Sequence, residues 1–254
     1  MRYSTFLLAL LLSSVSLLAK DRQFYQIKIY HLKDAQQEQQ LDRYLEKSYL
    51  PALHRMGIKQ VGVFKPVTKD TADLRVYVMF PFQKLEQLAG LDNQFYQDAQ
   101  FLKDGQSYIN AAWNMPPYSR IESIILQAFP GMPAMATPAL QGARAERVYE
   151  LRSYESPSEK YHMNKVKMFN TGDEIGIFKR LGFNAVFYAS VISGSRMPNL
   201  MYMTTFNNKA DRDAHWKSFS DDPQWKQLSA KEEYSHNVSK ADILFLQPTD
   251  YSDY

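Results

Sequence analysis

Two charged residues, Glu150 and Arg152, stand two positions apart in an alternating segment and are the first candidates for chemistry in this chain. Residues two apart on a β-strand point to the same face, so both side chains would lie beside Tyr154. A charge is not placed inside a dry core without a partner. Two interpretations follow. The pair is either an ion pair near the mouth of a barrel, or a set of polar side chains that bind a small ligand in an aromatic cavity.

The histidines form the second group of candidates: His31, His54, His162, His215 and His236. No two of them stand four apart on a helix with a carboxylate between them, so a zincin-type motif is excluded and we predict no metal site. A single helical histidine that faces a cavity can ligate haem iron or act as a general base. His54, His162 and His215 qualify by position, and the alternative for each is a surface or capping role. We therefore predict no cofactor, with haem as the alternative.

Other catalytic signatures are missing from the sequence. The segment Ser193–Asn199 has the composition of a phosphate loop, but no helix follows it, and we predict a hairpin turn. There is no cysteine, which excludes thiol chemistry and disulfides. The formal net charge is +3 and the basic residues are interspersed with acidic ones, so no basic stripe for nucleic acid is present. The 17 Tyr and 15 Phe instead suit packed cores and small-molecule cavities.

An internal duplication indicates which elements position these residues. The segment Phe24–Tyr30 returns 124 positions later as Val148–Tyr154, and His54–Ile58 returns 125 positions later as Lys179–Phe183. Each copy also has a glycine, Gly57 or Gly182, where a helix would end. A repeat of this length predicts two copies of one small domain.

Hydrophobic periodicity gives both copies the order β-α-β-β-α-β, typical of a ferredoxin-like unit. In the first copy we predict strands and helices at residues 24–30, 34–55, 59–64, 74–80, 82–110 and 121–127. In the second copy they fall at residues 147–154, 157–181, 183–191, 200–206, 209–234 and 241–247. Gly90 and Gly105 are expected to interrupt the long helical region of the first copy, and Thr171-Gly172 and Gly176 the first helix of the second.

The chain divides into four segments. Residues 1–19 have the basic start, short apolar stretch and small final residue of a secretory signal, so we expect export to the periplasm or beyond the cell. Residues 20–128 form the first repeat, 129–145 a linker rich in proline, and 146–254 the second repeat. No other apolar stretch reaches membrane-spanning length, so no stable span is expected after the signal is removed.

A ferredoxin-like unit covers one sheet face with helices and leaves the other open. Two copies can bury their open faces against each other as an α+β barrel. We predict that the polar face of the first strands, with Glu150 and Arg152 in one copy and Lys28 in the other, looks into this barrel, while Tyr25 and Ile27 pack under helices. The predicted ligand-binding residues are Glu150, Arg152, Tyr154, Tyr188, Tyr202, His54 and His215.

The second copy resembles the NIPSNAP family over nearly all of residues 146–247. The resemblance rests on the motifs VYELRSY at 148–154, PNLMYM at 198–203, DRDAHW at 211–216 and DDPQWK at 221–226. The first copy is a diverged relative that lacks the last two motifs. The resemblance implies the dimeric α+β barrel fold but no agreed reaction. The same fold is similar to that of small monooxygenases and haem-binding chlorite dismutases, and fold alone does not transfer function.

Three functions stay open from the sequence. The first is an exported protein that binds a small, partly apolar ligand between its two sheets. The second is an oxidoreductase, either cofactor-free or haem-dependent. The third is an interaction module in which Trp216 and Trp225 contact a partner or a second subunit, the alternative being that both pack on their own sheet. The sequence leaves open whether the barrel closes within one chain or between two chains of a homodimer.

Overall fold

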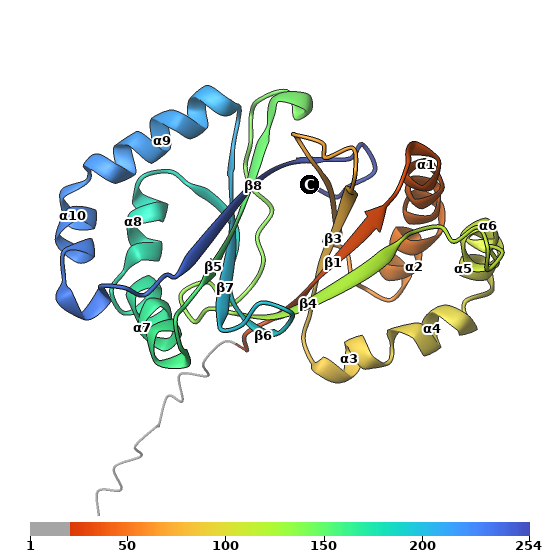
Figure 1. Cartoon of the computed structure of the whole chain (residues 1–254), viewed down its shortest axis with the longest axis horizontal. Helices are drawn as coiled ribbons and strands as arrows, with labels where there is room; N and C mark the ends of the chain where they lie inside the picture. Colours follow the sequence, from red (N-terminus) through yellow and green to blue (C-terminus); the bar gives the residue numbers. More distant parts are fainter. Residues whose placement is uncertain (1–20) are drawn as a thin grey trace, which may run out of the picture.

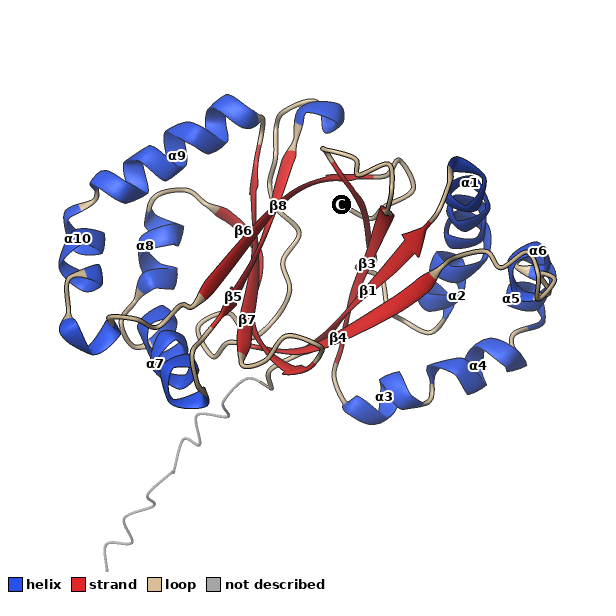
Figure 2. Cartoon of the chain, viewed as in Figure 1, coloured by secondary structure: helices blue, strands red, loops and turns tan. Residues whose placement is uncertain are grey.

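The strands of this protein close into one eight-stranded barrel with helices on its outside (Figure 1, Figure 2). The computed structural model describes residues 21–254, and the predicted signal segment 1–19 lies outside the described residues. Around the barrel the strands follow the order β1-β3-β2-β8-β5-β7-β6-β4, and β4 pairs with β1 to complete the circle. All the strand pairs are antiparallel.

The first repeat contains four strands and a set of helices on the right of Figure 1. Its elements are β1 Phe24–Leu32, α1 Ala35–Tyr44, a π-helical segment Leu45–Tyr49, α2 Leu50–Arg55, β2 Gly62–Pro66, β3 Leu74–Phe82, α3 Leu85–Ala89, α4 Leu91–Gln97, α5 Ala99–Asp104, α6 Gln106–Ile109 and β4 Arg120–Ala128. As predicted, the long helical region is interrupted at Gly90 and Gly105, which are the C-caps of α3 and α5.

The second repeat follows the same order, with its helices on the left of Figure 1. A short 3₁₀ turn, Arg144–Glu146, precedes it, and its elements are β5 Val148–Glu155, α7 Glu159–Asn170, α8 Glu174–Arg180, β6 Asn184–Ser193, β7 Asn199–Phe206, α9 Lys209–Asp221, α10 Pro223–Ser229, a 3₁₀ turn Glu232–Tyr234 and β8 Lys240–Pro248. Strand–helix–strand–strand–helix–strand order in both halves confirms the tandem ferredoxin-like fold.

The two repeats are joined along two seams, so the barrel closes within a single chain. One seam pairs β4 with β6, and the other pairs Phe64–Pro66 of β2 with Leu246–Pro248 of β8. Aromatic contacts cross the interior between the repeats: the ring centroids of Phe64 and Tyr149 are 5.1 Å apart, and those of Tyr25 and Phe187 are 5.4 Å apart. The two open sheet faces therefore bury each other, as the fold requires.

The predicted direction of the strand faces is wrong. Tyr25 and Ile27 of β1 and Tyr149 of β5 point into the barrel and share one core, whereas Glu150 and Arg152 lie under helix α9. The reason is the requirement that buried charges be paired. Helix α9 supplies partners for Glu150 and Arg152, whereas the barrel interior near Tyr149 is filled by aromatic rings.

Candidate functional site in the barrel

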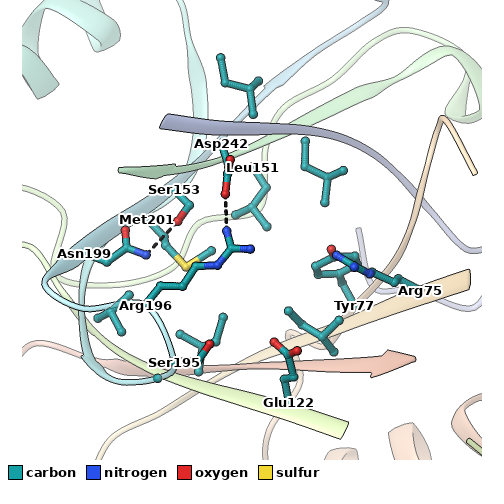
Figure 3. Close-up of a pocket in the computed structure, with 16 residues that line it drawn as sticks. Arg75, Tyr77, Glu122, Leu151, Ser153, Ser195, Arg196, Asn199, Met201 and Asp242 are labelled. Atoms are coloured by element: carbon teal, nitrogen blue, oxygen red, sulfur yellow. Dashed lines mark hydrogen bonds and ion pairs between the residues drawn. The ribbon is translucent and has the colours of Figure 1, made fainter. Parts of the chain in front are cut away.

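One end of the barrel contains a cavity of about 300 Å³ (Figure 3). Seven of the eight strands contribute to its wall, so both repeats build it. The deeper wall is mostly apolar and consists of Ile29, Tyr77, Ile124, Leu151, Val191, Met201 and Leu244. A polar mouth lies toward the strand ends and consists of Arg75, Glu122, Ser153, Arg196, Asn199 and Asp242.

The opposite end of the barrel is packed with aromatic side chains. Tyr254 closes it, with its ring 5.8 Å from Phe64 and 6.4 Å from Tyr149, measured between centroids. Burial raises the pKa of Tyr25 and of Tyr254, so both phenols stay neutral at ordinary pH. Among the described residues, aromatic side chains thus fill this end, and the cavity lies at the end with the polar mouth.

The mouth of the cavity carries charges of both signs in pairs. Arg196, in the β6–β7 hairpin, forms an ion pair with Asp242 of β8, and Asn199 donates a 2.8 Å hydrogen bond to Ser153 (Figure 3). Arg75 donates a 2.7 Å hydrogen bond to Asp73. A guanidinium has five N–H donors, and each of these arginines uses only part of that capacity in its ion pair. Donors therefore remain available to a ligand at the cavity entrance.

A histidine lies between two carboxylates beside this mouth and hydrogen-bonds to one of them, Asp73. The Nδ1 atom of His31 is 2.8 Å from Asp73, and its Nε2 atom is 3.2 Å from the Oε1 atom of Glu122. Burial alone would raise the pKa of Asp73, but hydrogen bonds from Arg75 and His31 outweigh it and lower that pKa. Asp73 is therefore ionised and orients His31, which in turn contacts Glu122 at the edge of the cavity.

Tyr77 is the polar residue in the cavity's deeper wall. Its side chain is 6% exposed, and burial raises the pKa of its phenol, with a hydrogen bond from Arg75 opposing the rise. A neutral phenol can donate one hydrogen bond to a ligand and accept another.

The predicted residues Glu150, Arg152, Tyr154 and Tyr202 do lie together, but outside the barrel. Glu150 accepts hydrogen bonds from Arg152 at 2.6 Å, from Arg212 at 2.7 and 2.9 Å, and from the indole of Trp216 at 2.9 Å. Burial would raise the pKa of Glu150, but the contacts with Arg212 and Arg152 lower it.

Arg152 joins this carboxylate to two tyrosines. It donates to the Tyr154 hydroxyl at 2.8 Å, and that hydroxyl lies 2.9 Å from the hydroxyl of Tyr202. The network is fully paired and none of these side chains lines the barrel cavity. The ion-pair interpretation is thus the one the geometry supports, beneath a helix rather than at a barrel mouth.

The remaining predicted residues are also outside the cavity. Tyr188 stacks beside Tyr202 under the helices of the second repeat, with ring centroids 5.6 Å apart. His54 contacts Asp253 at 2.9 Å, and His215 packs its ring against Phe183 and keeps its Nδ1 atom 2.8 Å from the carbonyl of Asp211.

The donor set of the cavity does not fit a histidine-ligated haem, because no histidine lines its wall. Within residues 21–254, no cluster of three or more histidine, aspartate or glutamate side chains is arranged to hold a metal ion. In the same range, no helix is long and apolar enough to cross a membrane.

Both tryptophans of the interaction hypothesis pack on their own repeat. The guanidinium carbon of Arg152 lies 3.6 Å from the centre of the Trp216 ring. The Trp225 ring is 4.4 Å from that of Phe219, and both indoles are half-buried. Neither forms a protruding anchor.

Sequence reasoning missed the residues that line the cavity, notably Arg75, Tyr77, Glu122 and Asp242. A signal for them was present in strand parity. Glu122 has the same parity as Leu126 on its strand, as Arg75 has with Met79, and both Leu126 and Met79 belong to the interior core. Charged residues at the end of an otherwise apolar interior row mark the mouth of a barrel.

Comparison with known proteins assigns the second repeat. The NIPSNAP family model matches residues 149–253. Residues 149–253 are a NIPSNAP domain. This domain supplies β5 to β8, and therefore most of the cavity wall, including Arg196 and Asp242. No curated protein matches the chain.

Solved structures share the fold of the whole chain at low identity. A putative monooxygenase from Fusobacterium nucleatum subsp. nucleatum ATCC 25586 is 9% identical and covers 90% of this chain and 93% of its own, with a TM-score of 0.58. One from Lactobacillus acidophilus NCFM is 12% identical, covers 89% and 94%, and has a TM-score of 0.55. A putative chlorite dismutase is 9% identical, covers 91% and 97%, and has a TM-score of 0.51. These likenesses extend the dimeric α+β barrel fold to both the NIPSNAP domain and the repeat before it.

Proposed function

We propose that the protein binds a small organic molecule inside the barrel, with the apolar body of the ligand in the deeper part of the cavity and a hydrogen-bond-accepting head at the mouth. The observation that carries this proposal is the cavity of about 300 Å³ with apolar walls and a polar entrance. Ligand sites in proteins have this combination of size and lining. The predicted signal segment would place this binding outside the cytoplasm, and that location stays a prediction.

The walls select for the body of the ligand. Leu151, Val191 and Met201 present aliphatic and thioether surface, so burial of hydrocarbon is the main favourable term. The mouth selects for the head. Arg75 and Arg196 are donors only, and Tyr77 can donate as well, so a carbonyl, phenolate or carboxylate oxygen fits best.

Native mass spectrometry of protein purified from its own host without refolding tests this proposal, with an absorbance spectrum of the same sample. We expect a bound mass that is lost when the Val191→Phe substitution fills the cavity. Ile192→Phe is the matched control, because Ile192 is the next residue on β6 and is 39% exposed. A wild-type chain of bare sequence mass that also takes up no octanoate or octanol, or a bound mass unaffected by Val191→Phe, would refute the proposal.

Oxidation of the bound molecule is the second candidate function. The observation that favours it is a carboxylate on the cavity wall, Glu122, whose Oε1 atom lies 3.2 Å from Nε2 of His31, which Asp73 orients. Glu122 would remove a proton from an activated methylene group beside a phenol. Dioxygen would then oxidise the resulting carbanion, with one oxygen atom retained as a carbonyl and the other released with two hydrogens as water.

Oxygen consumption with anthrone-type phenols checks this second function. We expect turnover that falls at least tenfold in Glu122→Gln, whereas Glu155→Gln, at the end of β5 and outside the cavity lining, leaves it unchanged. No oxygen uptake by the wild type across such phenols would leave binding as the whole function.

A further inference from the structure

A second cavity, of about 370 Å³, lies in the first repeat between β1 and the surrounding helices. It is on the other side of β1 from the barrel interior, because Lys28 lines it while Ile27 and Ile29 belong to the barrel core. Its walls are mainly aromatic: Tyr44, Tyr49, Phe95, Phe101, Tyr108 and Trp113. The rings of Tyr44 and Tyr108 stack with centroids 3.8 Å apart and planes 4° apart, which gives one wall a flat, rigid form.

The ammonium group of Lys28 is the charge of this cavity. Its Nζ atom lies 3.4 Å from the hydroxyl of Tyr49 and 5.1 Å from the centre of the Tyr49 ring. Among residues 21–254, no carboxylate lies within salt-bridge distance of it. Cation–π contact stabilises the half-buried ammonium only in part, so an anion placed here would gain more than at an exposed lysine.

The second repeat shows what this position looks like when its charge is neutralised. Arg152 is the counterpart of Lys28 at the offset of 124, and Glu150 and Trp216 pair with it and cover it. In the first repeat Gln26 replaces Glu150 and donates instead to Ser123 at 2.7 Å. The carboxylate has been lost while the cation is kept.

The indole that covers Arg152 in the second repeat also has no counterpart, since the motif that contains Trp216 does not occur in the first repeat. Residues of the short helices α4 to α6 and of the segment 111–118 line the cavity beside Lys28 instead, and they leave it open. The first repeat thus keeps the cation without the carboxylate and the indole that pair with it in the second repeat.

We propose that this cavity binds a small planar aromatic carboxylate, whose anionic group pairs with Lys28 and whose ring lies against the tyrosine wall. Trp113 supplies the outer contact: its side chain is 92% exposed, so burial against a ring removes a large apolar surface from water. Asp92 is the one carboxylate in the cavity lining, and it lies at the exposed rim, where solvent and salt screen its repulsion.

Calorimetric titration with 2-naphthoate tests this inference, with 2-naphthalenemethanol as its uncharged analogue. We expect the carboxylate to bind at least tenfold more tightly than the alcohol. Lys28→Met should remove that difference, Lys28→Arg should keep it, and Asp92→Asn should strengthen naphthoate binding about twofold at low salt. Val191→Phe, which fills the barrel cavity, should leave naphthoate binding unchanged.

Circular dichroism melting establishes that each variant is folded. If Lys28→Met does not fold, Trp113→Phe replaces it as the test, since so exposed a side chain is not needed for folding, and it should weaken naphthoate binding at least threefold. Equal affinity for acid and alcohol, or loss of binding in Val191→Phe, would overturn the inference. The latter result would place the probe in the barrel and leave the proposed function intact.

Discussion

At the scale of single residues, Glu150 shows how a charge is held in this fold. Its side chain is completely buried, yet two arginines and an indole donate to it. Pairing of this kind compensates the cost of taking a carboxylate out of water. The cost returns in full when one partner is removed, because the remaining charges stay buried without compensation.

Replacing Glu150 by Gln should therefore lower the free energy of unfolding by about 3 kcal/mol, since Arg152 and Arg212 would lose their shared counterion. Urea unfolding of the wild type and the variant measures this loss. Glu146→Gln, at an exposed position just before β5, is the control and should change stability by less than about 0.5 kcal/mol. A loss of similar size in both variants would contradict the assignment.

The same carboxylate predicts how stability depends on pH. The pKa of Glu150 in the folded protein is lower than its usual value of 4.5, because the arginine contacts outweigh burial. Its contribution is therefore complete above that usual value and is lost as the pH falls through the lowered folded value. Wild-type protein should lose more stability on acidification below pH 4.5 than Glu150→Gln does, in urea titrations at a series of pH values.

The sequence was sufficient to find Glu150 and Arg152 as a pair, because their spacing shows them on one strand face. It did not show which face, since a period of two defines two sides without saying which one a helix covers. Arg212 and Trp216, four apart on one helix, are the partners that determine which face of β5 carries Glu150 and Arg152. Recognising them requires knowledge that α9 crosses β5, a contact between residues about 60 positions apart.

At the scale of elements, the helix ends were predictable because their chemistry is local. Gly57 and Gly182 adopt φ values of +86° and +80°, in the left-handed region that a side chain disfavours. The two positions differ in their surroundings. A Cβ atom at Gly57 would have no neighbour within 4 Å, whereas one at Gly182 would lie 3.3 Å from Nε2 of His215.

Because the two glycines differ in their surroundings, alanine substitutions at both positions form a matched comparison. Gly57→Ala should cost about 1 kcal/mol, from backbone strain alone. Gly182→Ala should cost more, because His215 must also move from its contact with Phe183. Thermal unfolding of the two variants compares them, and an equal loss at both sites would show that the His215 contact carries no energy.

At the scale of the whole molecule, the barrel interior belongs to both repeats at once. Phe187 packs on Tyr25 across the interior, and Phe64 packs on Tyr149. The two sequence copies were visible as a repeat, and the barrel followed from the need to cover two open sheet faces. The cavity at one end could not be predicted in the same way, because its size depends on how far the aromatic side chains fill the other end.

A shared interior predicts one cooperative unfolding transition rather than two. Hydrogen exchange measured by mass spectrometry should give the same opening free energy for the most protected peptides of β1 and β7. Phe187→Ala should lower both values together, by about 3 kcal/mol, although Phe187 lies in the second repeat. Ile192→Ala on the same strand is the exposed control. Loss of protection confined to β7 would mean that the repeats unfold independently.

Closure within one chain also governs the time course of biosynthesis. The first four strands are complete at Ala128, but the strands that cover their open face end only at Pro248. At ordinary rates of translation, synthesis of the intervening roughly 120 residues takes on the order of 6–24 s. During that interval the nascent sheet exposes Tyr25, Ile27 and their neighbours. The time before this face is covered depends on chain elongation and not on an encounter with a second polypeptide. The rate of barrel closure should therefore be independent of protein concentration.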